Sequence, residues 1–276
     1  MEVITYKQTR ELFLNKRKSD SHKGNYGRVL IIAGSKGMMG ATILCAKAAL
    51  RTGSGLVTVS VPEDQMMIVQ IGIPEATCIG RDINKDLSAE ALSKYDAIAI
   101  GPGLGTDGHA SEMMHHIMEV YRGNLVLDAD ALNILAEYQR PLTEKIIITP
   151  HPGEAARLLD TTVEMVEADK EAAFFSLVKK YKCKVILKGS QTLVSPVNVN
   201  TTGNPGMATG GSGDVLTGII TSLLGQKIDT TKAAQAGVYI HGLAGDIMSE
   251  KIGEQGLIAS DIIKGIPKAL KKISKG

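Results

Sequence analysis

The 276-residue sequence predicts an α/β fold with a mainly parallel central sheet and helices on both faces. Short apolar runs rich in β-branched residues alternate with longer Ala- and Leu-rich segments, as in buried parallel strands joined by helices. No Pro-, Ser- or Gly-rich linker and no change in composition divides the chain. We therefore expect one domain over residues 1–276.

The strands and helices follow from these runs in chain order. Strands are predicted at 28–33, 56–61, 95–100, 125–128, 145–149 and 183–189, with a β-hairpin arm over 194–201. Helices are predicted at 7–18, 41–53, from Pro62 onward, and at 108–121, 163–181, 214–224, 230–250 and 259–272. Pro267 is expected to bend or break the last helix.

Composition excludes several classes of partner. A net charge of +2 gives no concentrated basic surface for nucleic acid or a membrane, and the absence of Trp disfavours base-stacking platforms. The three cysteines lack metal-site spacing and fit a reducing compartment. The N-terminal stretch has no apolar signal region, and no run approaches the ~18 apolar residues of a membrane span. We expect a cytoplasmic protein.

The glycine-rich stretch before the predicted helix 214–224 is the strongest candidate for a binding site. Its sequence, TGNPGMATGGSGD, includes Gly211 and Gly213 and ends at Asp214. Backbone N–H groups at a helix N-terminus bind anions, and glycines let the chain approach a phosphate closely. The alternative is that Asp214 only caps the helix. A cap does not require so many glycines, so we favour the binding role.

Three other clusters directly follow predicted strands, and the carboxyl ends of parallel strands are where ligands bind. They are GPGLG at 101–105, TPHPGE at 149–154 and KGSQT at 188–192. GPGLG is either a cradle or a plain tight turn. His151 is either a surface residue or a site residue held rigid by two prolines, and Glu154 either favours a helix N-terminus or reaches a magnesium-bound phosphate through water. Lys188 suits a nucleotide phosphate, although a surface position is the alternative.

An anion site with one carboxylate and no evident second acid predicts phosphoryl transfer to a hydroxyl. Asp214 would accept the proton of that hydroxyl. Since a helix N-terminus lowers the pKa of a carboxylate, we expect Asp214 to be a weak base that mainly orients the hydroxyl. A second loop, with Gly34, Gly37 and Gly40, also precedes a helix, but its spacing is not that of a dinucleotide fingerprint.

Six motifs in a fixed order resemble the ADP-dependent bacterial branch of the NAD(P)H-hydrate dehydratases, within the ribokinase-like superfamily. They are GNYGRVLIIAGS, GPGLGTD, LDADALN, TPHPGE, KG at 188–189 and NPGMATGGSGDVLTG. The resemblance spans residues 24 to about 218. It implies a repair enzyme that converts the S epimer of NADHX or NADPHX to NADH or NADPH. The C6 hydroxyl is phosphorylated by ADP, and phosphate is then eliminated.

The resemblance also implies roles for single residues. Asp214 is the base toward the C6 hydroxyl and contacts the hydrated dinucleotide. The residues expected to bind the nucleotide are Lys188, Gly189, Ser190, Gln191, Thr192 and Gly213, to which the glycine-rich loop adds Gly211. Those expected to line the substrate site are Ala41, Gly105 and His151, with Gly103 from the same GPGLG loop. Mg²⁺ is expected to bridge the ADP phosphates through ligands that the sequence does not assign.

The chain is too short for a fused epimerase domain, so a separate epimerase is the expected functional partner, and the family implies a homo-oligomer, commonly a tetramer. Two other functions stay open. One is a kinase of the same fold that phosphorylates a thiazole or pyrimidine alcohol with ATP. The other is a non-catalytic nucleotide sensor. ADP is preferred over ATP by resemblance alone, and the sequence does not distinguish NADHX from NADPHX.

Overall fold

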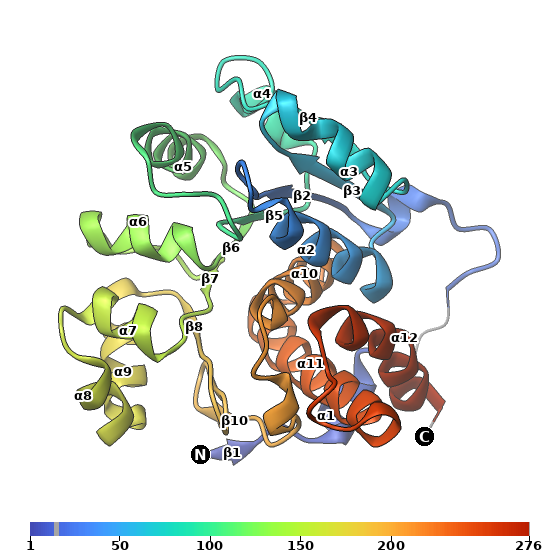
Figure 1. The fold of residues 1–276 in the computed structure, drawn as a ribbon, viewed down its shortest axis with the longest axis vertical. Coiled ribbons are helices and arrows are strands. Elements are labelled where there is room, and N and C mark those ends of the chain that lie inside the picture. The colour runs from blue at the N-terminus through green and yellow to red at the C-terminus, as the bar shows by residue number, and fades with distance from the viewer. Residues whose placement is uncertain (14–16, 276) are drawn as a thin grey trace.

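The computed structural model describes residues 1–13 and 17–275 of the chain. These residues form one ten-stranded sheet in the order β1-β10-β9-β8-β7-β6-β5-β2-β3-β4, drawn in Figure 1. The strands are β1 Glu2–Val3, β2 Arg28–Ile32, β3 Leu56–Ser60, β4 Thr77–Ile79, β5 Ala97–Ile100, β6 Asn124–Leu127, β7 Ile146–Ile148, β8 Lys184–Leu187, β9 Leu193–Val194 and β10 Asn198–Val199.

The sheet is mainly parallel, as the sequence predicts. Seven neighbouring strands, in the spatial order β4-β3-β2-β5-β6-β7-β8, are parallel to one another. The predicted hairpin arm consists of β9 and β10, and β9 is antiparallel to both of its neighbours. The carboxyl ends of the parallel strands therefore meet at one edge, where the loops after β5, β6, β7 and β8 lie together.

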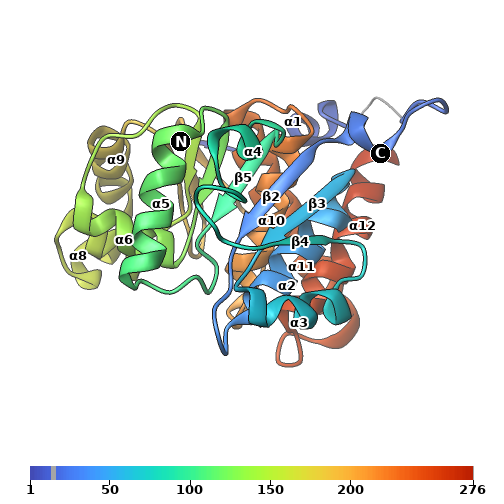
Figure 2. The same cartoon turned by 90° about the horizontal axis from the view of Figure 1, so that it is seen from above.

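Helices cover both faces of the sheet, as predicted (Figures 1 and 2). One core joins Val29 and Ile31 of β2 to α2 Met39–Thr52, α3 Met66–Gly72, α10 Ser212–Gly225, α11 Thr230–Ile252 and α12 Ala259–Lys275. The other joins Leu30 and Ile32 to α4 Ala89–Ser93, α5 Gly108–Val120, α6 Asp130–Tyr138, α7 Pro152–Leu159, α8 Val163–Ala168 and α9 Lys170–Tyr181. Since successive side chains alternate between faces, a continuous apolar strand fills both cores.

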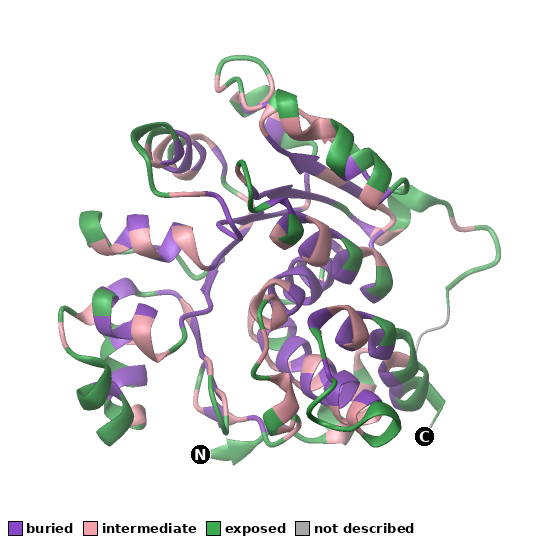
Figure 3. Cartoon of the chain, in the orientation of Figure 1, coloured by how far each residue is buried: buried purple, intermediate pink, exposed green. Residues whose placement is uncertain are grey.

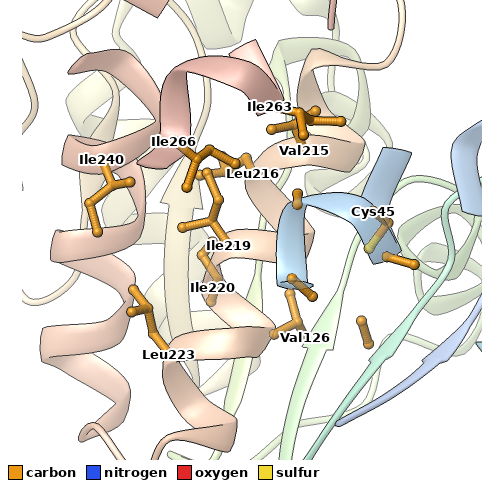
Figure 4. Close-up of a cluster of buried hydrophobic side chains, with 14 of the residues drawn as sticks. Cys45, Val126, Val215, Leu216, Ile219, Ile220, Leu223, Ile240, Ile263 and Ile266 are labelled. Carbon is orange, nitrogen blue, oxygen red and sulfur yellow. The ribbon is translucent and has the colours of Figure 1, made fainter. Parts of the chain in front are cut away.

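Helix α10 lies in the centre of the first core. Residues 215–225 are all buried, and Figure 4 shows Ile219, Ile220 and Leu223 among side chains of the neighbouring helices. An ideal Cβ at Gly218 would lie 2.1 Å from the carbonyl oxygen of Cys45, so glycine is required for the close packing of α10 on α2. The N-terminus of α10 is consequently fixed by a buried helix body (Figure 3).

Several boundaries differ from the sequence prediction. The single helix predicted over 163–181 is wrong, because Asp169 leaves helical geometry and separates α8 from α9. The helix expected from Pro62 starts with a short 3₁₀ turn and extends only to Gly72. Helix α12 runs unbroken through Pro267. The pattern missed β1, β4, α4 and α6, which are short elements.

At the N-terminus, the predicted helix 7–18 corresponds to α1 Tyr6–Glu11, and residues 14–16 lie outside the described part of the chain. Between α1 and β2 the chain contains the 3₁₀ turn Lys23–Tyr26. Among the helices of the described residues, none is both long and apolar enough to span a bilayer.

Candidate active site

A cavity of about 810 Å³ opens at the carboxyl ends of β7 and β8. Its wall is formed by the loops that follow these strands, by the loop before α10, and by one face of α11. The residues are His151, Lys188, Gly189, Ser190, Gln191, Thr192, Asn200, Thr201, Thr202, Gly203, Asn204, Pro205, Met207, Ala208, Ser212, Gly213, Leu216, Val238, His241 and Gly242. This volume lies within the range of small-molecule sites, which is roughly 300–1,000 Å³.

The N-terminus of α10 reaches the edge of this cavity without a side-chain cap. Gly211 occupies the N-cap position in the left-handed region, with φ of 85°, and within residues 1–13 and 17–275 no side chain makes a capping hydrogen bond there. The interpretation of Asp214 as a simple cap is therefore wrong. The backbone N–H groups of a first turn without a side-chain cap remain available to a ligand.

Asp214 lies in this first turn, and its surroundings change the pKa of its carboxyl group. Burial raises its pKa to about 7, and the nearby negative charges of Asp128, Asp130 and Glu154 act in the same direction. Lys188 partly opposes the shift. Our expectation of a lowered pKa is wrong, because desolvation and neighbouring carboxylates outweigh the helix dipole here. A carboxylate with a pKa near neutrality is well suited to accept a proton.

A buried ion pair lies next to Asp214. Lys188 Nζ is 2.8 Å from Asp128 Oδ1 and 3.6 Å from Glu154 Oε2, and the Thr217 hydroxyl donates to Asp128 Oδ2 over 2.6 Å. Burial opposes both charges, but the Lys188 ammonium holds the pKa of Asp128 below its usual value. The Asp128 and Glu154 carboxylates in turn raise the pKa of Lys188. The ammonium of Lys188 is thus fixed at the cavity wall by two carboxylates.

The TPHPGE segment forms the start of α7. The His151 N–H donates to Glu154 Oε2 over 2.8 Å, and His151 Nδ1 accepts from the N–H groups of Gly153 and Glu154. Partial burial lowers the pKa of His151. Its ring is half exposed and forms part of the cavity wall. The helix N-terminus alternative for Glu154 is therefore confirmed. Glu154 also approaches Lys188, and its contact with a magnesium-bound phosphate stays a prediction.

The KGSQT residues at 188–192, which we call the nucleotide loop after the role predicted from the sequence, all line the cavity. The loop is anchored at its start by a bond from the Lys188 N–H to the Pro150 carbonyl, over 2.8 Å. Within it, the Thr192 hydroxyl donates to the Gly189 carbonyl over 3.0 Å. Gly213 lies opposite, since an ideal Cβ there would be 3.4 Å from Lys188 Nζ.

Ala41, Gly103 and Gly105 lie outside the cavity wall, around the N-terminus of α2. An ideal Cβ at Gly103 would be 3.2 Å from the Ala41 Cβ, and the Gly34 N–H donates to the Pro102 carbonyl over 2.8 Å. The Gly105 N–H donates to Asp130 Oδ2 over 2.8 Å, so the GPGLG loop is held in place by a side chain of α6. The two glycine loops that follow β2 and β5 therefore form one surface.

Gly211 and Asp214 lie between these two regions. An ideal Cβ at Gly211 would be 2.3 Å from Leu44 Cδ1 of α2 and 3.7 Å from Asp214 Oδ2. Neither residue lines the cavity itself, although Gly213 between them does. The structure thus brings the predicted residues to one edge of the sheet in two groups, with the start of α10 between them.

Sequence reasoning missed three residues of this site. Asp128 is the last residue of the strand predicted at 125–128, within LDADALN, and this position at a strand end could have identified it. Thr217 gave no signal, because it lies inside a helix. His241 is a cavity residue on α11 whose Nε2 is 3.3 Å from the Ser212 hydroxyl. Burial lowers the pKa of His241 to about 4, so its ring is neutral at physiological pH.

The described residues contain no group of three or more His, Cys, Asp or Glu side chains that could hold a metal ion by themselves. Asp128 and Glu154 are both paired with Lys188 of the cavity wall. This arrangement fits Mg²⁺ carried by nucleotide phosphates and water rather than a cage of protein ligands.

The sequence matches a family model described as NAD(P)H-hydrate dehydratase over residues 29–268. The chain belongs to this family. An ADP-dependent (S)-NAD(P)H-hydrate dehydratase from Neisseria meningitidis is 43% identical, over 89% of this chain and 86% of that protein. A bifunctional NAD(P)H-hydrate repair enzyme from Coxiella burnetii is 44% identical, over 90% of this chain and 51% of that protein.

Solved structures of NAD(P)H-hydrate dehydratases share the fold. An ADP/ATP-dependent enzyme from Bacillus subtilis, crystallised with ATP and Mg²⁺, has a TM-score of 0.89 at 30% identity and covers 99% of this chain and 98% of its own. A ribokinase-like protein from Enterococcus faecalis has a TM-score of 0.90 at 30% identity, covering 100% and 97%. The ribokinase-like fold is therefore confirmed. This chain spans about half the length of the bifunctional relatives.

Proposed function

We propose that this protein is an ADP-dependent dehydratase of hydrated NAD(P)H. It converts the S epimer of NADHX or NADPHX to NADH or NADPH and releases AMP and phosphate from ADP. One observation carries the proposal: Asp214, with its pKa raised to about 7, lies at the start of α10 between a nucleotide-sized cavity and the loops around α2. A base between two binding regions suits transfer of a phosphoryl group from one ligand to a hydroxyl of the other.

ADP binds in the cavity, against Lys188 to Thr192 and the start of α10 at Gly211 and Gly213. The hydrated nicotinamide ring lies beside Asp214, and its dinucleotide extends over Ala41, Gly103 and Gly105. His151 contacts the ligands from the cavity wall. The adjacency of Gly211 to both α2 and Asp214 supports this division. One domain of residues 1–276 carries the whole site.

The reaction has two steps. Asp214 takes the proton of the C6 hydroxyl while its oxygen forms a bond to the β-phosphorus of ADP, and the bond to the bridging oxygen breaks to release AMP. The N–H groups at the start of α10 and the ammonium of Lys188 stabilise negative charge on the transferring group. Phosphate then leaves C6, a ring proton leaves C5, and the double bond of the reduced nicotinamide forms.

When bound with the nucleotide, Mg²⁺ would neutralise phosphate charge, and the complex of the Bacillus subtilis enzyme with ATP and Mg²⁺ supports this part of the proposal. Water-mediated contacts from Glu154 and Asp128 fit such an ion. ATP is a possible replacement for ADP, since the name of the same relative includes both nucleotides.

The bifunctional relatives motivate a further part of the proposal. They are named as repair enzymes with two functions, and this chain corresponds to about half of their length. We propose that a separate epimerase converts the R epimer for this enzyme. We also propose that the protein assembles as a homo-oligomer, with a tetramer as the expected form, and that it works in the cytoplasm.

The test is to incubate the purified protein with NADHX, Mg²⁺ and either ADP or ATP, and to follow absorbance of reduced nicotinamide. We expect NADH to form with equimolar AMP when ADP is supplied. A stable phosphorylated product without NADH would instead indicate a small-molecule kinase. Nucleotide binding without turnover of any hydrated cofactor would indicate a sensor, and either result would overturn the proposal.

A further inference from the structure

The nucleotide loop is held from outside the cavity by a lysine of α9. Lys170 Nζ donates to the carbonyl oxygens of Ser190, over 2.7 Å, and of Gln191, over 3.1 Å. The same nitrogen is 3.2 Å from an ideal Cβ at Gly189. One ammonium group thus contacts the middle of the five-residue loop, although Lys170 does not line the cavity.

The position of Lys170 in α9 runs against ordinary helix electrostatics. It is the first residue of the helix, after the Asp169 cap. A cation there faces the positive end of the helix dipole, which is unfavourable. Burial also lowers the pKa of Lys170, so the charge is partly desolvated. The two carbonyl bonds offset these costs, which indicates that the contact with the loop is the main role of this side chain.

The loop needs such support because its own conformation is unfavourable. Gln191 has a φ of 53°, in the left-handed region that a non-glycine residue seldom adopts. Ser190 and Gln191 are exposed, so packing does little to hold them. A strained conformation persists only where surrounding contacts determine it. The two bonds from Lys170 are contacts of this kind.

We propose that Lys170 is a positioning residue for nucleotide binding, a role that rests on the proposed function of the loop. By binding the Ser190 and Gln191 carbonyls on the α9 side, it keeps their partial negative charges away from the phosphates of ADP. The N–H groups and side chains of the loop then remain for the nucleotide. Lys170 touches neither ligand and acts through the backbone alone.

The test compares Lys170→Met, which removes the donor, with Lys170→Arg, which keeps it. Lys179→Met is the matched control, because Lys179 is an exposed lysine on the same helix. Calorimetry with MgADP measures affinity, and hydrogen exchange measures protection of the amides at 190–192 without ligand. Because a bond to a charged donor is worth about 1.5–3 kcal/mol, we expect Lys170→Met to weaken ADP binding about tenfold.

In the same variant, KM for ADP should rise with little change in kcat or in KM for NADHX, and the loop amides should exchange faster. Lys170→Arg should restore ADP affinity to within about twofold, as a guanidinium can donate to both carbonyls. Equal affinity and equal exchange in Lys170→Met and wild type would overturn the inference alone. A wild-type protein that binds no ADP would overturn the proposed function and this inference with it.

Discussion

Asp128 and Asp214 lie in the same site, yet their surroundings act on them in opposite directions. Asp128 is the more deeply buried, but its pKa is lowered because it pairs with Lys188 and accepts a bond from Thr217. In the part of the chain that the structure describes, Asp214 has no such hydrogen-bonded partner, and burial raises its pKa to about 7. The negative charge of Asp128 contributes to that rise. Burial alone therefore does not decide which carboxylate becomes a base. The presence or absence of a paired positive charge, here the Lys188 ammonium, decides it.

This difference in pKa gives the two carboxylates different roles in the site. A carboxylate held ionised by a lysine can fix that lysine beside a phosphate, whereas a carboxylate with a pKa near neutrality can exchange a proton. Pairs of acids whose pKa values are pushed apart in this way are typical of catalytic sites. The following predictions test this comparison.

Replacing the proposed base should have the largest effect. Asp214→Asn keeps the shape of the side chain but cannot accept the proton, so we expect turnover to fall by about 10²- to 10⁴-fold. Calorimetric affinity for ADP should stay close to that of wild type. If the variant turns over hydrated cofactor at the wild-type rate, Asp214 is not the base.

Replacing the paired acid should mainly affect stability. Asp128→Asn leaves the Lys188 ammonium without its closest carboxylate, and loss of one partner of a buried pair costs about 3–5 kcal/mol. Denaturant unfolding measures this cost. Lys264→Met, which breaks the exposed pair with Asp261, is the control and should cost less than about 1 kcal/mol. Similar losses of free energy of unfolding in Asp128→Asn and Lys264→Met would show that the Lys188–Asp128 pair contributes no more to stability than an exposed pair.

The bond from Thr217 to Asp128 should have a smaller effect, which a neighbour on the same helix calibrates. Thr217→Val removes a bond to a carboxylate and should cost about 1.5–3 kcal/mol in free energy of unfolding. Thr221 is equally buried, but its hydroxyl donates to the Thr217 carbonyl, so Thr221→Val should cost about 1 kcal/mol. A larger loss in Thr221→Val would contradict the role given to Thr217.

The pH dependence of stability should give the subtlest result. Folding raises the pKa of Asp214 from 3.8 to about 7, so the folded state binds the proton more tightly than the unfolded state does. Ionised Asp214 therefore lowers the free energy of unfolding progressively as the pH rises from 3.8 to about 7. The Asp214→Asn variant has no ionisable group at this position, so it does not lose stability in this way as the pH rises. Its Tm should exceed that of wild type by more at pH 8 than at pH 5. A gap that is constant or widens toward pH 5 would contradict the raised pKa.

Much of the molecule follows from local sequence pattern. The six apolar runs predicted as strands each contain one, since a continuous β-branched segment can be buried only between two layers of helices. The GPGLG and TPHPGE motifs and the nucleotide loop lie at the carboxyl edge as expected, because parallel strands bring their carboxyl ends together. Short elements such as β4 and α6 were missed because few residues carry their signal.

The sequence by itself determined the fold class, the edge that binds ligands and the place of Asp214 at a helix start, because strand burial and glycine-rich turns are local properties. Only the tertiary structure decided the charge state of that aspartate and the partners of Lys188. Both depend on Asp128, a residue 60 positions from Lys188 in sequence. Coulomb energies and desolvation are set by distances in space, which no local pattern encodes.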